Sequence, residues 1–153
     1  MFHMVSLTEL TVCFCAEEIN SGMHGILIIG GGGGFMGNTV EAWIHGQSVV
    51  GVTVGGPSQG GGNHGNTFRL KIEPGPRTTA LQVWDSDNRF ELDVLGCEGN
   101  QSVPCEQPYG LGAGVIWEKS AQRNTLWPGL MENVPNERRY IDRSEPSGSN
   151  RVL

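Results

Sequence analysis

The sequence predicts an all-β protein, and in particular an antiparallel β-sandwich. Glycine supplies 24 of the 153 residues, about twice its usual share, and it weakens helix interiors. Short runs of alternating apolar and polar residues recur at intervals of about ten residues, the spacing of strands and turns in sandwiches. No segment has a long helical period, and a chain of this length suits one domain.

The expected strands follow one another along most of the chain. The first lies at residues 7–16 and is rich in β-forming residues, and an apolar run at 26–29 leads into five consecutive glycines. Residues 38–56 contain two strands with a turn at 45–47, and the loop at 57–66 is too polar to build a core. Further strands are expected at 67–74, 78–84, 90–96 and 111–118.

Alternation assigns the side chains of two strands to opposite faces of a sheet. In the strand after Asn38, one face carries Val40, Ala42 and Ile44, and the other carries Glu41, Trp43 and His45. In the next alternating strand, the inward residues are Phe68, Leu70 and Ile72, and the outward ones are Arg69, Lys71 and Glu73.

The chain divides into a β-sandwich domain at residues 1–119 and a polar tail at 120–153. The tail contains few apolar residues and is therefore expected to be a flexible, loop-rich segment. No internal repeat is recognised in the sequence.

Composition limits the classes of partner. The formal charge of −6 argues against a nucleic-acid partner, which requires clustered basic residues. A negative charge of this size suits a protein that binds a metal ion through carboxylates. The sequence contains no run of 18 apolar residues that could cross a membrane, and the first 20 residues do not have the pattern of a signal peptide. These features leave the compartment open, either cytoplasmic or secreted.

The four cysteines allow two interpretations. Cys97 and Cys105 bracket a short segment that a disulfide could close, whereas Cys13 and Cys15 are neighbours on one strand face and poorly placed for one. Four reduced thiols remain the alternative. Neither pair has the spacing of a zinc site.

The glycine run allows a nucleotide-binding interpretation. Gly32, Gly34 and Gly37 match the dinucleotide fingerprint after an apolar strand. A helix should then begin at Asn38, but only about two turns fit before Gly46, and no acidic residue follows for the ribose. A small nucleotide-binding protein is therefore kept only as a further alternative.

Three aspartates crowd the stretch LQVWDSDNRFELDVLG, at Asp85, Asp87 and Asp93. Close carboxylates repel one another unless a cation lies between them. Ca²⁺ prefers six to eight oxygen ligands, which such a loop supplies. The sequence thus predicts a calcium site at these three residues, and the alternative is a solvated acidic turn.

The same stretch resembles a C2 domain, the calcium-dependent, phospholipid-binding β-sandwich. The apolar strand, the Asp-x-Asp pair, the third Asp and the following Val-Leu-Gly resemble its sixth strand, third loop and seventh strand. LTVCFCAEEI, VEAWIHGQ and NHGNTFRLKI resemble earlier strands, so that the resemblance covers about residues 7–96. The spacing of Cys97 and Cys105 resembles C2 domains of perforin-like secreted proteins.

The resemblance implies a peripheral membrane-binding module that holds Ca²⁺ and binds a phospholipid surface. The family's first loop normally supplies two further aspartates, but residues 17–38 contain none. A calcium-independent module that binds a protein partner is therefore the alternative. The apolar residues at 26–29, with Phe35 and Met36, are expected either to enter a bilayer or to pack in the core. No catalytic set is visible, so no enzymatic activity is expected.

Overall fold

The computed structural model describes residues 11–15, 24–28, 35–45, 50–57, 62–73, 78–95, 112–132 and 134–153. Its strands are all parallel to their neighbours. Sheet A has the order β1 (Thr11–Cys15), β4 (Thr39–His45), β7 (Thr67–Glu73), β9 (Arg89–Val94), β11 (Thr125–Met131) and β13 (Arg151–Val152).

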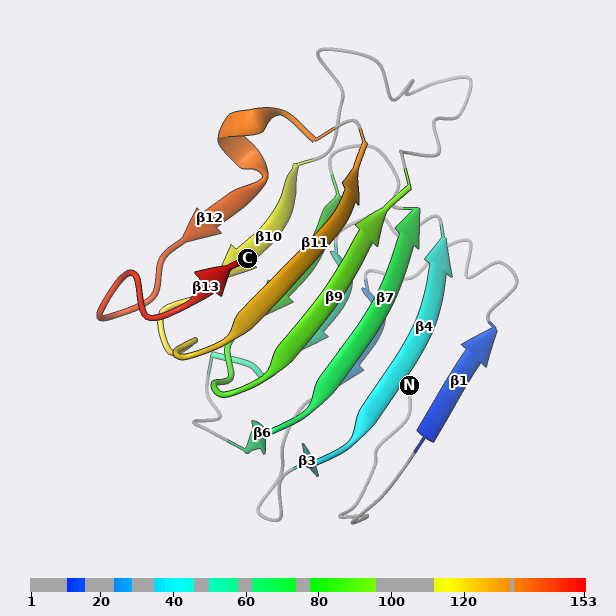
Figure 1. Ribbon diagram of the computed structural model, residues 1–153, viewed down its shortest axis with the longest axis horizontal. Coiled ribbons are helices and arrows are strands. Elements are labelled where there is room, and N and C mark those ends of the chain that lie inside the picture. The colour runs from blue at the N-terminus through cyan, green and yellow to red at the C-terminus, as the bar shows by residue number, and fades with distance from the viewer. Residues whose placement is uncertain are drawn as a thin grey trace.

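Sheet B lies behind sheet A, and its strands run in the opposite direction (Figure 1). Its order is β12 (Tyr140–Asp142), β10 (Ala113–Trp117), β8 (Thr79–Val83), β5 (Val50–Val54) and β2 (His24–Ile28). A small third sheet pairs β3 (Phe35–Met36) with β6 (Asn63–His64), and the 3₁₀ helix η1 spans Asn136–Arg138. In the described part of the chain no helix is long and apolar enough to cross a membrane.

The chain winds as a parallel β-solenoid. It passes from a strand of sheet A to a strand of sheet B and back, and each strand pairs with the strand one coil away rather than with its sequence neighbour. Each coil therefore contributes one strand to each sheet, and the two sheets enclose the core between them.

The antiparallel β-sandwich predicted from the sequence is wrong. The strands at 39–45, 67–73, 79–83, 89–94 and 113–117 lie close to where alternation placed them, but their pairing is parallel throughout. Alternation reports which side of a strand is buried, and a solenoid buries one side of sheet A as a sandwich does. The direction of pairing depends on contacts between coils, which no local pattern contains.

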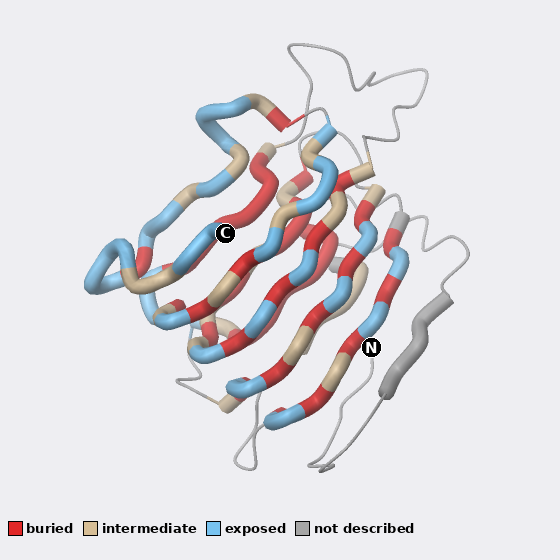
Figure 2. Tube along the Cα trace, viewed as in Figure 1, coloured by how far each residue is buried: buried red, intermediate tan, exposed pale blue. Residues whose placement is uncertain are grey.

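The predicted faces of sheet A are confirmed. Buried and exposed residues alternate along β4, β7 and β9 (Figure 2). Val40, Ala42, Ile44, Phe68, Leu70 and Ile72 are all buried. The strands β5 and β10 are buried along their whole length. Their sequences VGVTV and AGVIW are apolar except for Thr53, the near-continuous pattern expected of parallel strands covered on both faces.

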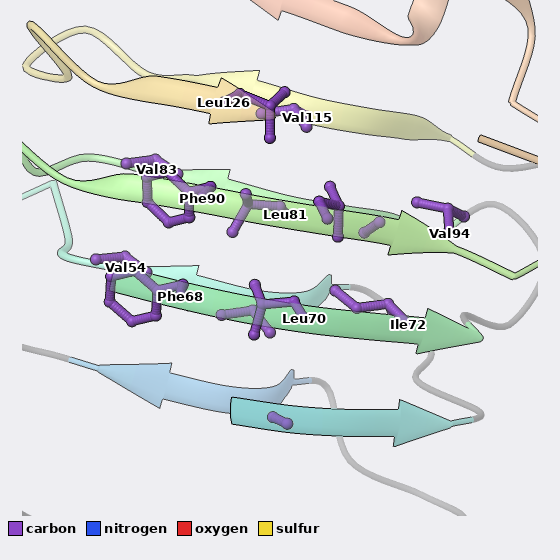
Figure 3. Packing of buried hydrophobic residues seen from close by; sticks show 14 of the residues in the cluster. Val54, Phe68, Leu70, Ile72, Leu81, Val83, Phe90, Val94, Val115 and Leu126 are labelled. Atoms are coloured by element: carbon purple, nitrogen blue, oxygen red, sulfur yellow. The ribbon is translucent and has the colours of Figure 1, made fainter. Parts of the chain in front are cut away.

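The core consists of like residues stacked from coil to coil (Figure 3). Phe68 lies in register with Phe90, and their rings stack with centroids 5.0 Å apart. Trp117 of sheet B is 2% exposed and tilts against Phe90 at 5.8 Å. Such buried side chains contribute about 1.5–3 kcal/mol each relative to exposure.

One asparagine per coil forms a ladder along the edge where the chain enters sheet A. Its members precede the strands β4, β7, β9, β11 and β13 and are Asn38, Asn66, Asn88, Asn124 and Asn150. The backbone N–H of each of the first four donates to the side-chain oxygen of the next, at 3.0, 3.1, 2.9 and 3.0 Å. The side-chain nitrogens donate to carbonyls of the turns, as Asn88 Nδ2 does to Asn63 O at 2.8 Å.

The residue before four of these asparagines has a positive φ. Gly37 and Gly65 each have φ of 69°, Asp87 has 60° and Arg123 has 54°. Glycine adopts this left-handed conformation freely and aspartate tolerates it. The turns into β4, β7, β9 and β11 are therefore each built from a left-handed residue followed by a buried asparagine.

The segment expected as a flexible tail, residues 120–153, continues the solenoid. It supplies β11, β12 and β13, and Asn124 and Asn150 extend the ladder. Its low apolar content does not prevent this, because side-chain hydrogen bonds from Asn124 to Asp85 O and from Asn150 to Ala121 O hold its turns. Among the described residues after position 121, Leu126 and Val134 are the buried hydrophobic ones.

We predict that Asn88→Ala lowers the free energy of unfolding by about 3 kcal/mol, because it leaves the buried N–H of Asn66 and the carbonyl of Asn63 without a partner. Chemical denaturation measures this change. The control Asn136→Ala, at an exposed position in η1, should change it by less than about 0.5 kcal/mol. Equal effects of the two substitutions would contradict a structural role for the ladder.

We also predict that the last coil loses stability in acid. Burial alone would raise the pKa of Asp142, but hydrogen bonds from Ser144 and Gly148 outweigh it and lower the pKa below its ordinary 3.8. Because the folded pKa is depressed, this contribution is full well above pH 4 and is lost as the pH falls through the folded pKa.

Urea denaturation between about pH 5 and pH 3 tests this acid sensitivity. Asp142→Asn should show a smaller loss of stability over that range than the wild type, and Glu137→Gln should match the wild type. An unchanged slope for Asp142→Asn would refute the assignment.

Candidate functional site: the outer face of sheet A

The structure gives Asp85 and Asp87 separate roles in one turn. Asp85 is 2% exposed, and its carboxylate accepts a hydrogen bond from Asn63 Nδ2 at 2.5 Å. It also fills the space beside Gly55, where a Cβ would lie 2.7 Å from the Asp85 carboxyl carbon. Asp87 is exposed and forms a two-point ion pair with Arg123 of the next coil, at 2.7 and 2.6 Å. These hydrogen bonds lower the pKa of Asp87.

Asp93 lies away from that turn, on the outer face of β9. It is four residues beyond Arg89, the first residue of the strand, which is about 13 Å along an extended chain. Its Oδ1 accepts the backbone N–H of Leu130 at 2.8 Å. The structure therefore does not bring the three predicted calcium ligands together. No group of three or more metal-binding side chains is found in the described ranges.

The structure also locates part of the glycine motif and of the apolar residues that the sequence suggested as other sites. Gly37 occupies the left-handed turn before Asn38 and is followed by a strand, not by the helix that a nucleotide fingerprint needs. Gly32, Gly34, Cys97 and Cys105 lie outside the described residues, as does the side-chain environment of Cys13 and Cys15. Of the apolar residues considered for membrane insertion, Phe35 is buried in the core cluster, whereas Met36 is 45% exposed.

A broad groove crosses the outer face of sheet A, the front sheet in Figure 1. It has a volume of ≈ 970 Å³ and is lined by residues of β4, β7, β9 and β11. Because all four strands are in register, the outward side chains form straight rows across the sheet. One row contains Glu41, Arg69, Glu91 and Trp127, and the next contains Trp43, Lys71 and Asp93.

Two exposed tryptophans lie at opposite ends of the groove. Trp43 on β4 is 49% exposed and Trp127 on β11 is 40% exposed. Three strand spacings and a two-residue offset separate them, which places their Cα atoms about 16 Å apart. Large aromatic side chains that are about half exposed at both ends of one groove are typical of binding surfaces.

Charged side chains of both signs fill the space between the tryptophans. Arg69 contacts Glu41 at 2.6 Å and Glu91 at 3.4 Å. The hydrogen bond to Glu41, and then the charge of Glu91, raise the pKa of Arg69. Exposed ion pairs of this kind add little stability, but they hold the guanidinium between its two carboxylates.

An irregularity in β11 shapes the wall of the groove beside Asp93. The register between β9 and β11 shifts between Pro128 and Met131. A Cβ on Gly129 would collide with Asp93, at 1.8 Å from its Oδ1. Glycine at this position therefore leaves room for the carboxylate, which the N–H of Leu130 then orients toward the groove.

Sequence reasoning placed Glu41 and Trp43 together on one face of their strand and Arg69 and Lys71 on the outward face of theirs, but did not join them into a site. The signal that could have joined them is the motif that opens each coil: NTVEAWI, NTFRLKI, NRFELDV and NTLWPGL. Aligning these segments on their first asparagine places Trp43, Lys71 and Asp93 in one column and Glu41, Arg69, Glu91 and Trp127 in another. This alignment is the register that the structure has.

A scan against protein-family models and searches of curated proteins and of solved structures found no match.

The positions of the three aspartates lead us to expect that Ca²⁺ does not stabilise this protein by specific binding. A thermal melt with and without millimolar Ca²⁺ measures this, because a ligand of the native state raises stability by mass action. We expect no saturable shift in Tm. A saturable rise that Asp87→Asn abolishes would instead support the calcium site predicted from the sequence.

Proposed function

We propose that the groove on sheet A binds an extended carbohydrate chain, so that this protein is a glycan-binding module. The observation that carries the proposal is the pair Trp43 and Trp127, exposed at opposite ends of one groove with charged side chains between them. Neither the calcium-dependent phospholipid function nor the nucleotide function expected from the sequence has a comparable observation in its favour.

A glycan matches this mixture of side chains better than an apolar partner does. A sugar ring presents C–H groups on its faces, which pack on a flat indole, and hydroxyls at its rim, which both donate and accept hydrogen bonds. Carboxylates such as Glu91 accept from hydroxyls, and Arg69 donates to them. An apolar partner would instead bury these charges without hydrogen-bond partners, which is unfavourable.

The shape of the site favours a chain over a single sugar. The distance of about 16 Å between the two tryptophan Cα atoms is several times the width of one sugar ring. The groove is open at its surface and shallow, because its floor is a sheet. A ligand that contacts both tryptophans must therefore lie across the strands, along the axis of the solenoid.

We predict that Trp43→Ala and Trp127→Ala each weaken oligosaccharide binding about tenfold, since each removes one stacking platform worth about 1.4 kcal/mol. Isothermal titration calorimetry with a panel of hexasaccharides, including cello-, xylo-, manno- and chito-oligomers and a galacturonate oligomer, measures the affinities. The double variant should lose detectable binding.

The matched control is Tyr140→Ala. Tyr140 is 37% exposed but lies on β12 of sheet B, away from the groove, so its removal should leave affinity unchanged. Failure of every member of the panel to bind the wild type, or equal effects of all three substitutions, would overturn the proposal.

A further inference from the structure

We propose that the glycan bound by this groove is uncharged, an inference that rests on the proposed function and narrows it to a class of ligand. The charged side chains that line the groove carry it. Three are acidic and three are basic: Glu41, Glu91, Asp93, Arg69, Lys71 and Arg89. Their formal charges cancel, so the groove has no excess charge with which to attract an acidic or a basic chain.

The positions of the charges strengthen this inference. Arg69, at the centre of the groove, is already bracketed by the carboxylates of Glu41 and Glu91. Lys71 lies in register beside Asp93, whose Oδ1 is held by the N–H of Leu130. A ligand carboxylate or sulfate that approached Arg69 would have to displace one of its partners and would then lie next to a like charge.

The net charge of the whole chain also disfavours an acidic ligand. The formal net charge is −6, and long-range repulsion slows and weakens the approach of polyanions at low ionic strength. Hydroxyl groups of a neutral sugar, by contrast, accept from Arg69 or donate to Glu91 without disturbing the ion pairs that position these side chains. The groove thus presents hydrogen-bond donors and acceptors but no net charge.

The test compares neutral and acidic hexasaccharides on the full chain by calorimetry, at low salt and at about 0.5 M NaCl. Cello-, xylo- and manno-hexasaccharides serve as neutral probes and a galacturonate hexamer as the acidic probe. We expect at least one neutral probe to bind about tenfold or more tightly than the galacturonate. Its affinity should change by less than about twofold with salt.

A variant that removes the carboxylate partners of Arg69, here called the unmasking variant, tests whether the groove itself selects a neutral ligand. Glu41→Gln combined with Glu91→Gln removes both partners of Arg69 and leaves the groove with a net charge of +2, while the amides still accept hydrogen bonds. This variant should gain affinity for galacturonate about tenfold at low salt and lose the gain at high salt. Glu137→Gln with Glu145→Gln, two exposed positions outside the groove, is the control with the same change in net charge and should show no gain.

The outcomes separate the two proposals. Tight, salt-sensitive binding of galacturonate by the wild type that Trp43→Ala weakens would overturn the inference of a neutral ligand and leave glycan binding in place. An equal gain in the control and the unmasking variant would also overturn it, since net charge rather than the groove would then select the ligand. Binding by neither class, or binding that the tryptophan substitutions do not affect, would overturn the glycan function itself.

Discussion

The architecture depends on the ladder of buried asparagines that joins one coil to the next. Each rung satisfies a backbone N–H at the point where the chain turns into sheet A, and the turn cannot be buried without such a partner. The same side chains donate to carbonyls of neighbouring turns. Every asparagine of the ladder both donates and accepts hydrogen bonds. If one coil were displaced along its strands relative to its neighbours, buried polar groups would be left unpaired along this edge.

The ladder also explains why the groove exists. It starts β4, β7, β9, β11 and β13 of sheet A at the same level, so residues at equal distances from their asparagines lie side by side. Outward side chains from coils far apart in sequence then form rows. Trp43 and Trp127 are separated by 84 positions in the chain, and register alone places them on one surface. Stacked aromatic rings inside the sheet, such as Phe68 on Phe90, maintain the same register from the core side.

The acidic stretch from Asp85 to Asp93 illustrates how one local pattern can serve several structural purposes. Asp85 is a buried hydrogen-bond acceptor, Asp87 occupies a left-handed turn position and pairs with Arg123, and Asp93 belongs to the groove. The spacing that resembles a C2 domain's third loop is here the end of a sheet B strand, a turn and a sheet A strand. Strand-loop-strand spacing is common to both arrangements, so the motif by itself did not distinguish them.

The sequence by itself determined the all-β class, the approximate strands and their buried faces, because alternation and turn residues act locally. The tertiary structure alone decided that pairing is parallel, that residues 120–153 continue the solenoid, and which outward side chains meet in a groove. The coils begin at asparagines 38, 66, 88, 124 and 150, and their unequal lengths hide the repeat from a search for a fixed period. Contacts between successive coils, which join residues 22 to 37 positions apart, supply the information that no single segment contains.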